Sequence, residues 1–225
     1  MNRLLFYNIG TDVEAFSTMR DAELPYPVTQ PHQTHEDRIA LIDRPGLTRE
    51  DLEGIDALIT NLRGCAIGVR TADCIPVLMY DPVHHAVAAV HCGWKSTVKH
   101  ISGKAIARMA DEFGTVASDL RAIIGPGIGP DSFQVQEDVV NKFAEAGFSM
   151  NEVCRFDGPR IPDSMIGGYH IDLWRANEWL LREAGLKAVN ISISGICTYT
   201  DNDRFYSARR EGTKCPRIIN SIRLK

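Results

Sequence analysis

The sequence has no long uninterrupted apolar run. Its longest apolar stretches, such as residues 86–90, are far shorter than the roughly 18 to 20 residues of a transmembrane helix, so a membrane-spanning protein is not expected. The first residues contain neither a secretory apolar segment nor a small-residue cleavage site. We therefore predict a soluble, cytoplasmic protein without a membrane partner.

Blocks of basic charge are also missing from the sequence. The 25 Lys and Arg residues are balanced by 29 Asp and Glu residues, which gives a net charge of −4, and the longest basic run is Arg209-Arg210. Nucleic acid is therefore not an expected partner.

The sequence contains no internal repeat, low-complexity segment or linker-like stretch. Its 225 residues are 44% hydrophobic and 24% charged, the balance of a globular protein that can bury a core without disulfides. We therefore predict one domain, residues 1–225. The cysteines are irregularly spaced, as is typical of reduced thiols, at Cys65, Cys74, Cys92, Cys154, Cys197 and Cys215.

Local patterns predict strands in pairs, interspersed with helices. After residues 4–7 the N-terminal third is expected to be irregular because of its prolines, which leaves His35 on a loop. Strands are predicted at residues 57–60, 65–69, 76–80, 86–91, 121–124, 190–194 and 217–224, and helices at residues 48–51, 96–109, 137–146 and 172–184. This order predicts a mixed α/β (α+β) fold with mixed sheets flanked by helices.

The runs 76–80 and 86–91 form the clearest hairpin in the sequence. Opposed positions in an antiparallel pair have a constant sum of residue numbers, and a turn flanked by Asp81 and His84 pairs Cys74 with His91. Opposed Cβ atoms lie about 4.5 to 5.5 Å apart, so a thiolate and an imidazole there can bind one metal ion. The prediction depends on this register, because a slip of one residue moves one side chain to the other face. Pro76 favours an edge position for its strand.

A third ligand must come from elsewhere, and the His32-Gln33-Thr34-His35 loop offers two imidazoles. Three protein ligands leave one coordination position open, as in catalytic zinc sites, where a bound water reaches a pKa of about 7. The spacing alone leaves the choice of histidine open. It also leaves open that Cys74 and His91 are ordinary packed residues.

Four motifs together resemble those of one protein family. They are residues 71–78 (TADCIPVL), 89–95 (AVHCGWK), 125–129 (GPGIG) and 197–212 (CTYTDNDRFYSARREG). In this order they are similar to the laccase-domain family, also called the polyphenol oxidase or purine nucleoside phosphorylase family. Some of its members are named peptidoglycan editing factor. The resemblance covers nearly the whole chain.

The resemblance implies a cytoplasmic zinc enzyme whose metal and catalytic residues are His35, Cys74 and His91. It also implies a layered α/β fold similar to that of cysteine-hydrolase toxins. Family members are described as phosphorolysing adenosine, inosine and methylthioadenosine and as deaminating adenosine. The implied partners are therefore a small-molecule nucleoside and phosphate.

The sequence departs from the family pattern at three places. Cys92 follows the metal histidine where a small residue is common, and in a strand its side chain would point away from His91 into the core. Gly127 replaces a frequent cysteine, which argues against thiol chemistry there. Lys95 replaces an arginine and keeps the charge but not the planar fork that binds phosphate in two places.

Several cations are candidates for binding an anionic substrate. Arg63 and Arg70 precede Cys74, Lys95 follows the metal histidine, and Arg209 lies in the last motif. We predict Arg63, Lys95 and Arg209 as substrate-binding residues.

Four functions are compatible with these residues. The first is a zinc-dependent purine nucleoside phosphorylase with adenosine deaminase activity. The second is an amidase that edits a peptidoglycan precursor, with Cys74 as nucleophile and His91 or His35 as base. Copper-dependent oxidation of phenols ranks last among the enzymes, because it needs more paired histidines than the 7 scattered ones here. A zinc-stabilised interaction module would require a fourth protein ligand.

Overall fold

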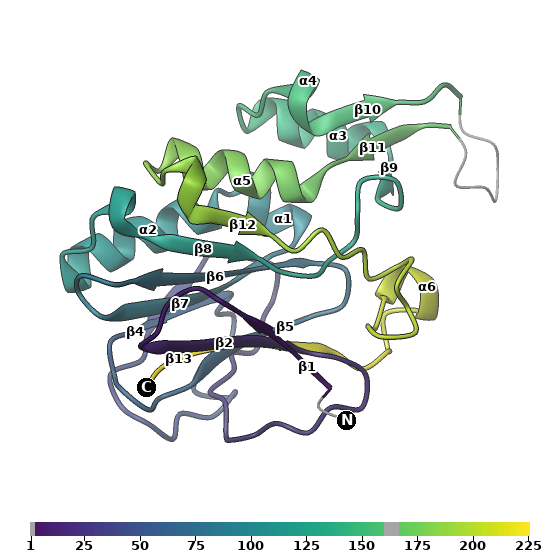
Figure 1. The fold of residues 1–225 in the computed structure, drawn as a ribbon. Coiled ribbons are helices and arrows are strands. Elements are labelled where there is room, and N and C mark those ends of the chain that lie inside the picture. Colours follow the sequence, from purple (N-terminus) through teal and green to yellow (C-terminus); the bar gives the residue numbers. More distant parts are fainter. Residues whose placement is uncertain (1–2, 160–166) are drawn as a thin grey trace.

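Two stacked β-sheets and a layer of helices make up the centre of the structure (Figure 1). This computed structural model describes residues 3–159 and 167–225. The larger sheet is mixed, and its strands follow the order β12 (Ile191–Ile193), β8 (Arg121–Ile124), β6 (Ile75–Asp81), β7 (Ala86–Cys92), β4 (Ala57–Thr60) and β3 (Ile39–Leu41). The smaller sheet is antiparallel, with the order β1 (Leu4–Tyr7), β2 (Val13–Thr18), β13 (Ile218–Leu224) and β5 (Ile67–Thr71).

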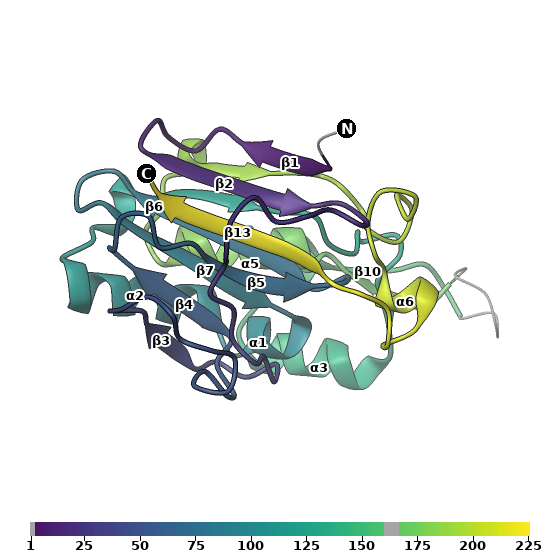
Figure 2. The same ribbon diagram turned by 90° about the horizontal axis from the view of Figure 1, so that it is seen from below.

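Helices cover the face of the large sheet that the small sheet leaves free. They are α1 (Trp94–Val98), α2 (Ile101–Phe113) and α5 (Leu173–Glu183). Figure 2 shows the small sheet lying across the opposite face. A third sheet, of β10 (Cys154–Phe156), β11 (Tyr169–Ile171) and β9 (Gln134–Val135), lies beside α3 (Glu137–Glu145) and α4 (Met150–Val153). Short helices are α6 (Ala208–Glu211), η1 (Ala117–Asp119) and η2 (Ala188–Asn190).

Alternating side chains of the central strands fill two separate cores. Every residue of β6 and β7 is buried. Val77 and Met79 pack in the core shared with the helices, whereas Leu78 and Ala89 pack in the core between the two sheets. Because both faces of these strands are covered, their sequences are continuously apolar. The predicted mixed α/β fold is confirmed.

The β6–β7 register differs from the predicted one by two residues. Ile75 pairs with Cys92 and Pro76 with His91, because the turn contains four residues, 82–85. The Asp81 carboxylate fixes this turn by accepting hydrogen bonds from the backbone N–H groups of residues 83 and 84, at 2.8 and 3.0 Å. A two-residue shift keeps every side chain on its predicted face, so Cys74 and His91 stay near each other.

The position of β6 in its sheet also differs from the prediction, because this strand is central. The Pro76 carbonyl faces the β8 side and accepts a hydrogen bond from Gly125 at 2.9 Å. Pairing of β6 with β8 begins only at Val77, opposite Ile124. Proline is tolerated there because the ladder between β6 and β8 does not extend to residue 76, so no N–H group is needed on that side.

Two predicted helices take other forms. Residues 48–51 make a turn in which the Asp51 carboxylate accepts hydrogen bonds from both the N–H and the hydroxyl of Thr48 at 2.8 Å. The helix predicted over residues 96–109 is divided into α1 and α2 by His100, whose φ of 59° is left-handed. Among the described residues, no helix has the length and apolarity to cross a bilayer.

We expect Leu78→Ala to lower the free energy of unfolding by about 2 to 5 kcal/mol, because it leaves a cavity between the two sheets. Urea unfolding would measure this loss. The control is Val83→Ala, since the Val83 side chain is 58% exposed on the turn. Equal stability of the two variants would contradict the assignment of Leu78 to a packed core.

Candidate metal centre

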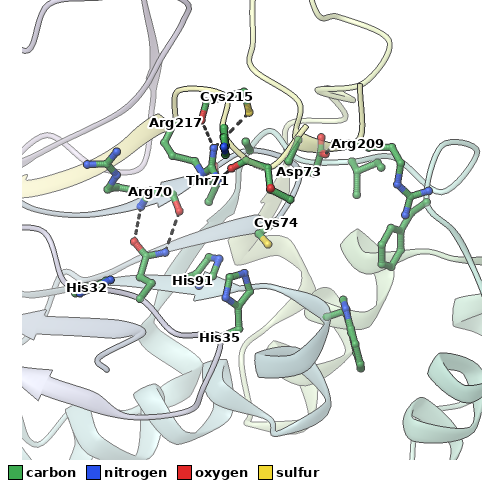
Figure 3. A pocket seen from close by; sticks show the side chains of 18 of the residues that line it. His32, His35, Arg70, Thr71, Asp73, Cys74, His91, Arg209, Cys215 and Arg217 are labelled. Carbon is green, nitrogen blue, oxygen red and sulfur yellow. Dashed lines mark hydrogen bonds between the residues drawn. The ribbon is translucent and has the colours of Figure 1, made fainter. Parts of the chain in front are cut away.

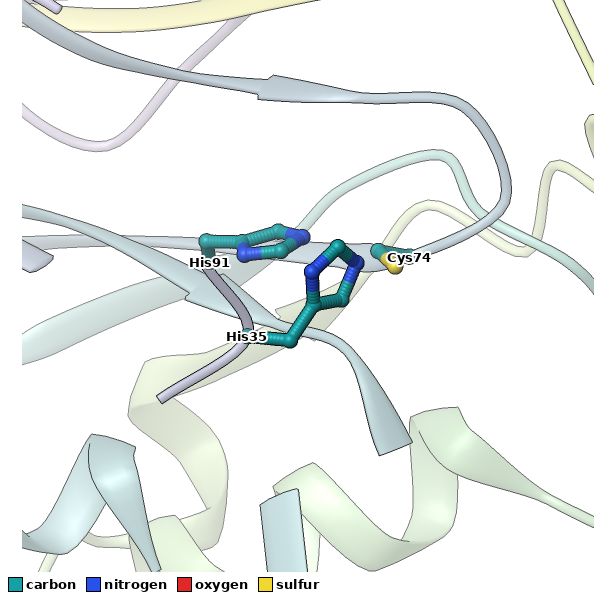
Figure 4. Close-up of side chains that lie close together, drawn as sticks. All are labelled: His35, Cys74 and His91. Carbon is teal, nitrogen blue, oxygen red and sulfur yellow. The ribbon is translucent and has the colours of Figure 1, made fainter. Parts of the chain in front are cut away.

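Three side chains from separate parts of the chain converge at one end of the sheets. His91 lies near the end of β7, Cys74 directly precedes β6, and His35 lies on the loop before β3 (Figure 4). One donor atom from each side chain lies within 4.8 Å of the other two. The structure therefore brings together the three residues that the sequence predicts as metal ligands.

A buried carboxylate, Asp56, holds two of these side chains in place. One oxygen of Asp56 lies 2.7 Å from His91 Nδ1 and accepts the backbone N–H of His35 at 3.0 Å. The other oxygen accepts the N–H groups of Thr34 at 3.1 Å and Glu36 at 2.9 Å. Three successive N–H groups can reach one carboxylate because His35 has a left-handed φ of 63°. Asp56 thus fixes the position of the 34–36 loop and the orientation of the His91 ring.

The charged groups of the site stabilise one another. Burial opposes ionisation of the Cys74 thiol, but the His91 imidazolium and hydrogen bonds from both histidines lower the pKa of Cys74 to about 6. Burial also opposes protonation of His91, but the Cys74 thiolate and Asp56 raise the pKa of His91 to about 9. Burial also opposes ionisation of the Asp56 carboxyl, but its hydrogen bonds to His91 and to the 34–36 loop hold its pKa below the ordinary value.

The donor set and the space around it fit a zinc ion. A thiolate and two imidazoles are preferred zinc ligands, and Asp56 supplies the second-shell carboxylate usual for a metal-binding histidine. A Cβ atom on Gly93 would lie 3.0 Å from both Cys74 Sγ and His35 Cδ2, so glycine permits the close approach. No fourth His, Cys, Asp or Glu joins the group within the described residues.

The residue before Cys74 ties distant segments to the centre. Asp73 has a left-handed φ of 83°, and its carboxylate accepts hydrogen bonds from the Thr198 hydroxyl at 2.7 Å and the Arg209 backbone N–H at 2.6 Å. A Cβ on Gly127 would lie 2.9 Å from the Asp73 carbonyl oxygen. The third and fourth sequence motifs therefore position the strand end that carries Cys74.

A cavity of about 750 Å³ opens beside the three donor atoms (Figure 3). Its lining includes four apolar residues, Trp94, Ile128, Phe133 and Ala208, and five cationic residues, Arg49, Arg70, Arg209, Lys214 and Arg217. The two kinds meet at Arg209, whose guanidinium lies 5.6 Å from the centroid of the Phe133 ring.

Of the predicted substrate-binding residues, Arg209 lines this cavity, and its guanidinium donates to the Gln134 carbonyl at 3.2 Å. Arg63 lies elsewhere, donating to the Lys225 carbonyl at 2.8 Å, because its segment pairs with the end of β13. Lys95 extends over the Trp94 ring, 5.7 Å from its centroid, and lines a different hollow. Arg63 and Lys95 are therefore not among the residues that line this cavity.

Asp56, Arg49 and Arg217 are not indicated by the sequence patterns. Asp56 directly precedes the predicted strand 57–60, and an acidic residue at a strand start was the available signal. Nothing local marks the two arginines, because only tertiary pairing brings them to the cavity. Cys92 is fully buried, as predicted.

The fold and the site define a layered α/β protein with a three-ligand candidate metal centre. Residues 13–225 match the family model described as "Multi-copper polyphenol oxidoreductase laccase". The chain belongs to this family, which confirms the resemblance seen in its motifs.

Two similar relatives carry enzyme names. The chain is 40% identical over 207 residues to "Purine nucleoside phosphorylase" of Bacteroides thetaiotaomicron, covering 89% of this chain and 74% of the relative. It is 36% identical over 201 residues to "Adenosine deaminase RL5" of an unknown prokaryotic organism, covering 87% and 74%. The crystal structure of the hypothetical protein YfiH of Bacillus licheniformis has a TM-score of 0.88 at 26% identity and covers 100% of this chain and 97% of its own.

Asp56→Asn should weaken zinc binding about 10- to 100-fold, because it removes the charged partner that orients His91. Competition with a chromophoric chelator would measure this affinity. Asp81→Asn is the matched control, since Asp81 is also buried and bonded to a histidine, His84, at the other end of the hairpin. An affinity equal to that of the control would rule out the second-shell role.

The metal-free protein should react with iodoacetamide at Cys74 with a pH midpoint near 6. Because the pKa of Cys74 is lowered to about 6, the reactive thiolate is present above that pH and is lost below it. Peptide mass spectrometry across pH 5–9 would follow the labelling. Burial raises the pKa of Cys154, which therefore serves as the internal comparison. A Cys74 midpoint as high as that of Cys154 would contradict the assigned charges, and bound zinc should block labelling.

Proposed function

We propose that this protein is a zinc-dependent purine nucleoside phosphorylase that acts on adenosine, inosine and methylthioadenosine and also deaminates adenosine. The observation that carries the proposal is the His35, Cys74 and His91 donor set on the wall of a cavity of about 750 Å³. Small-molecule sites have volumes of roughly 300 to 1,000 Å³. The names of two relatives, "Purine nucleoside phosphorylase" and "Adenosine deaminase RL5", support the same substrate class.

His35, Cys74 and His91 would hold the metal. Bound zinc would supply a Lewis acid at the cavity wall. Asp56 keeps a proton on His91 Nδ1, which leaves the other ring nitrogen as the ligand atom. The apolar side chains of Trp94 and Phe133 line the same cavity and can pack against the faces of a purine.

The two reactions differ in the nucleophile. In phosphorolysis a phosphate oxygen bonds to C1′ of the ribose while the C1′–N9 bond breaks, and the purine keeps the electron pair and gains a proton. The products are the free base and ribose 1-phosphate. In deamination a water oxygen bonds to C6 of adenosine, the C6–N bond breaks and ammonia leaves, which yields inosine. Only the first reaction requires an anion in the cavity.

The amidase function is the second candidate, because the lowered pKa of Cys74 favours a nucleophilic thiolate beside His91. Oxidation of phenols by several copper ions has less support. Among the described residues, only one group of three or more His, Cys, Asp or Glu side chains is close enough to share an ion. This group is His35, Cys74 and His91. Copper centres of that type need further histidine groups.

We expect the wild-type protein to convert adenosine to adenine and ribose 1-phosphate when phosphate is present and to inosine when it is absent. Cys74→Ala should abolish both conversions, because a metal ligand is lost, and a chelator should do the same to the wild type. Chromatography of adenine, inosine and hypoxanthine would measure the products.

The matched control is Cys154→Ala, which removes a thiol on β10 outside the cavity. If the wild type converts no nucleoside but releases the amino acid from a muramyl-aminoacyl substrate, the amidase function replaces the proposed one. Stoichiometric zinc in the purified protein separates a metal ligand from a purely nucleophilic cysteine.

A further inference from the structure

Two of the arginines that line the cavity, Arg70 and Arg217, are brought to one face of the small sheet by its strand register. Arg70 of β5 pairs with Ile219 of β13, and Thr71 pairs with Ile218. Ile219 is opposite Arg70, and Arg217 lies two residues before Ile219. Because side chains two residues apart on a strand point to the same face, Arg70 and Arg217 are on the same face of the small sheet. Diagonal neighbours of this kind are about 7 to 8 Å apart, within reach of one small ligand. Figure 3 shows both side chains at the cavity.

Arg70 is connected to the metal loop through its backbone. The side chain of Gln33 donates to the Arg70 carbonyl at 2.9 Å and accepts the Arg70 N–H at 2.8 Å. Gln33 is two residues before His35 and lines the same cavity. One side chain therefore fixes the end of β5 relative to the loop that carries a metal ligand.

Three arginines that line the cavity are without an ion pair in the part of the chain that the structure describes. Within residues 3–159 and 167–225, no carboxylate lies within ion-pair distance of Arg49, Arg70 or Arg217. Arg217 donates to neutral backbone carbonyls, including that of Thr213 at 2.6 Å, and Arg49 donates to the Pro31 carbonyl at 3.4 Å. The half-buried Arg70 guanidinium has no hydrogen-bond acceptor among the described residues.

The positive charges of Arg49, Arg70 and Arg217 lie close enough together to affect one another. Burial lowers the pKa of Arg70, and the charges of Arg49 and Arg217 lower it further. An arginine side chain remains charged under physiological conditions, so the three charges repel one another. An anion placed among them would remove this repulsion and provide the missing hydrogen-bond acceptors.

We propose that Arg70, assisted by Arg49 and Arg217, binds the phosphate co-substrate of phosphorolysis. The inference rests on the proposed function and assigns its second substrate to a site. Guanidinium groups bind phosphate oxygens in pairs, and a dianion matches the excess of positive charge of these arginines. The purine would then lie against the aromatic side chains of Trp94 and Phe133, which line the same cavity. The same chemistry would also bind the 5′-phosphate of a nucleotide, so the test separates the two sources.

Arg70→Met should raise the KM for inorganic phosphate about 10- to 100-fold, the effect of losing a charge-assisted hydrogen-bond pair. The KM for adenosine and the phosphate-independent deamination should change less than about twofold, since neither needs this anion site. Arg70→Lys should give an intermediate phosphate KM, because it keeps the charge and loses the fork. Zinc content and the circular dichroism spectrum would show that each variant is folded and loaded.

Arg121→Met is the matched control. Arg121 also lies on a strand, at the start of β8, and pairs with Tyr80 near the opposite end of the large sheet. Its phosphate KM should equal that of the wild type. Inhibition by AMP is measured in parallel at fixed adenosine concentration.

Three results would overturn the assignment of phosphate to Arg70. An unchanged phosphate KM in Arg70→Met combined with lost AMP inhibition would assign the site to a nucleotide 5′-phosphate. An unchanged KM with unchanged inhibition would remove Arg70 from anion binding. Equal loss of phosphorolysis and deamination would show a general structural role. If the wild type processes no nucleoside, the proposed function fails, and calorimetric titration with inorganic phosphate still decides the site: binding that Arg70→Met abolishes supports it, and binding unaffected by Arg70→Met overturns it.

Discussion

The interaction on which the site depends is the hydrogen-bonded carboxylate of Asp56. It accepts three successive backbone N–H groups of the 34–36 loop and contacts the His91 ring. Without it, the three backbone N–H groups of the 34–36 loop would lose their shared acceptor, and the buried His91 Nδ1 would lose its partner, the latter at a cost of about 1 to 3 kcal/mol. One buried negative charge therefore attaches the 34–36 loop to the end of β7. The position of two ligands relative to Cys74 follows from that attachment.

The location of the centre follows from the sheet topology. β5 and β7 end, and β4 and β6 begin, at the same end of the two stacked sheets. β6 and β7 are buried along their whole length and are mostly apolar, so the candidate ligands Cys74 and His91 lie at or near their ends. Gly93 and Gly127 allow the backbones to approach where the segments meet. The rigid sheets thus hold the site, and loops supply its variable part.

Local sequence patterns predicted the central hairpin and, through it, the proximity of Cys74 and His91, whereas the choice of His35 came from the family resemblance. An error of two residues in the register was harmless, since side-chain direction repeats with the same period. β2 was missed because its buried positions include Ser17 and Thr18, which the apolar pattern does not reveal. Their hydroxyls bond to the side chain of Asn220 and to the N–H of Ile219 on β13. Such pairing between the two ends of the chain leaves no local signal.

Local sequence patterns also do not indicate which arginines lie together. The sequence places many cations near the motifs, but only the pairing of β5 with β13 decides that Arg70 and Arg217 share a face and that Arg63 does not join them. Local charge then differs in sign from the net charge of −4 of the whole chain. A cavity lined by a candidate metal centre and by guanidinium groups without an ion pair among the described residues attracts anions. The proposed phosphorolysis has phosphate as its nucleophile and therefore needs an anion site, whereas the deamination of adenosine does not.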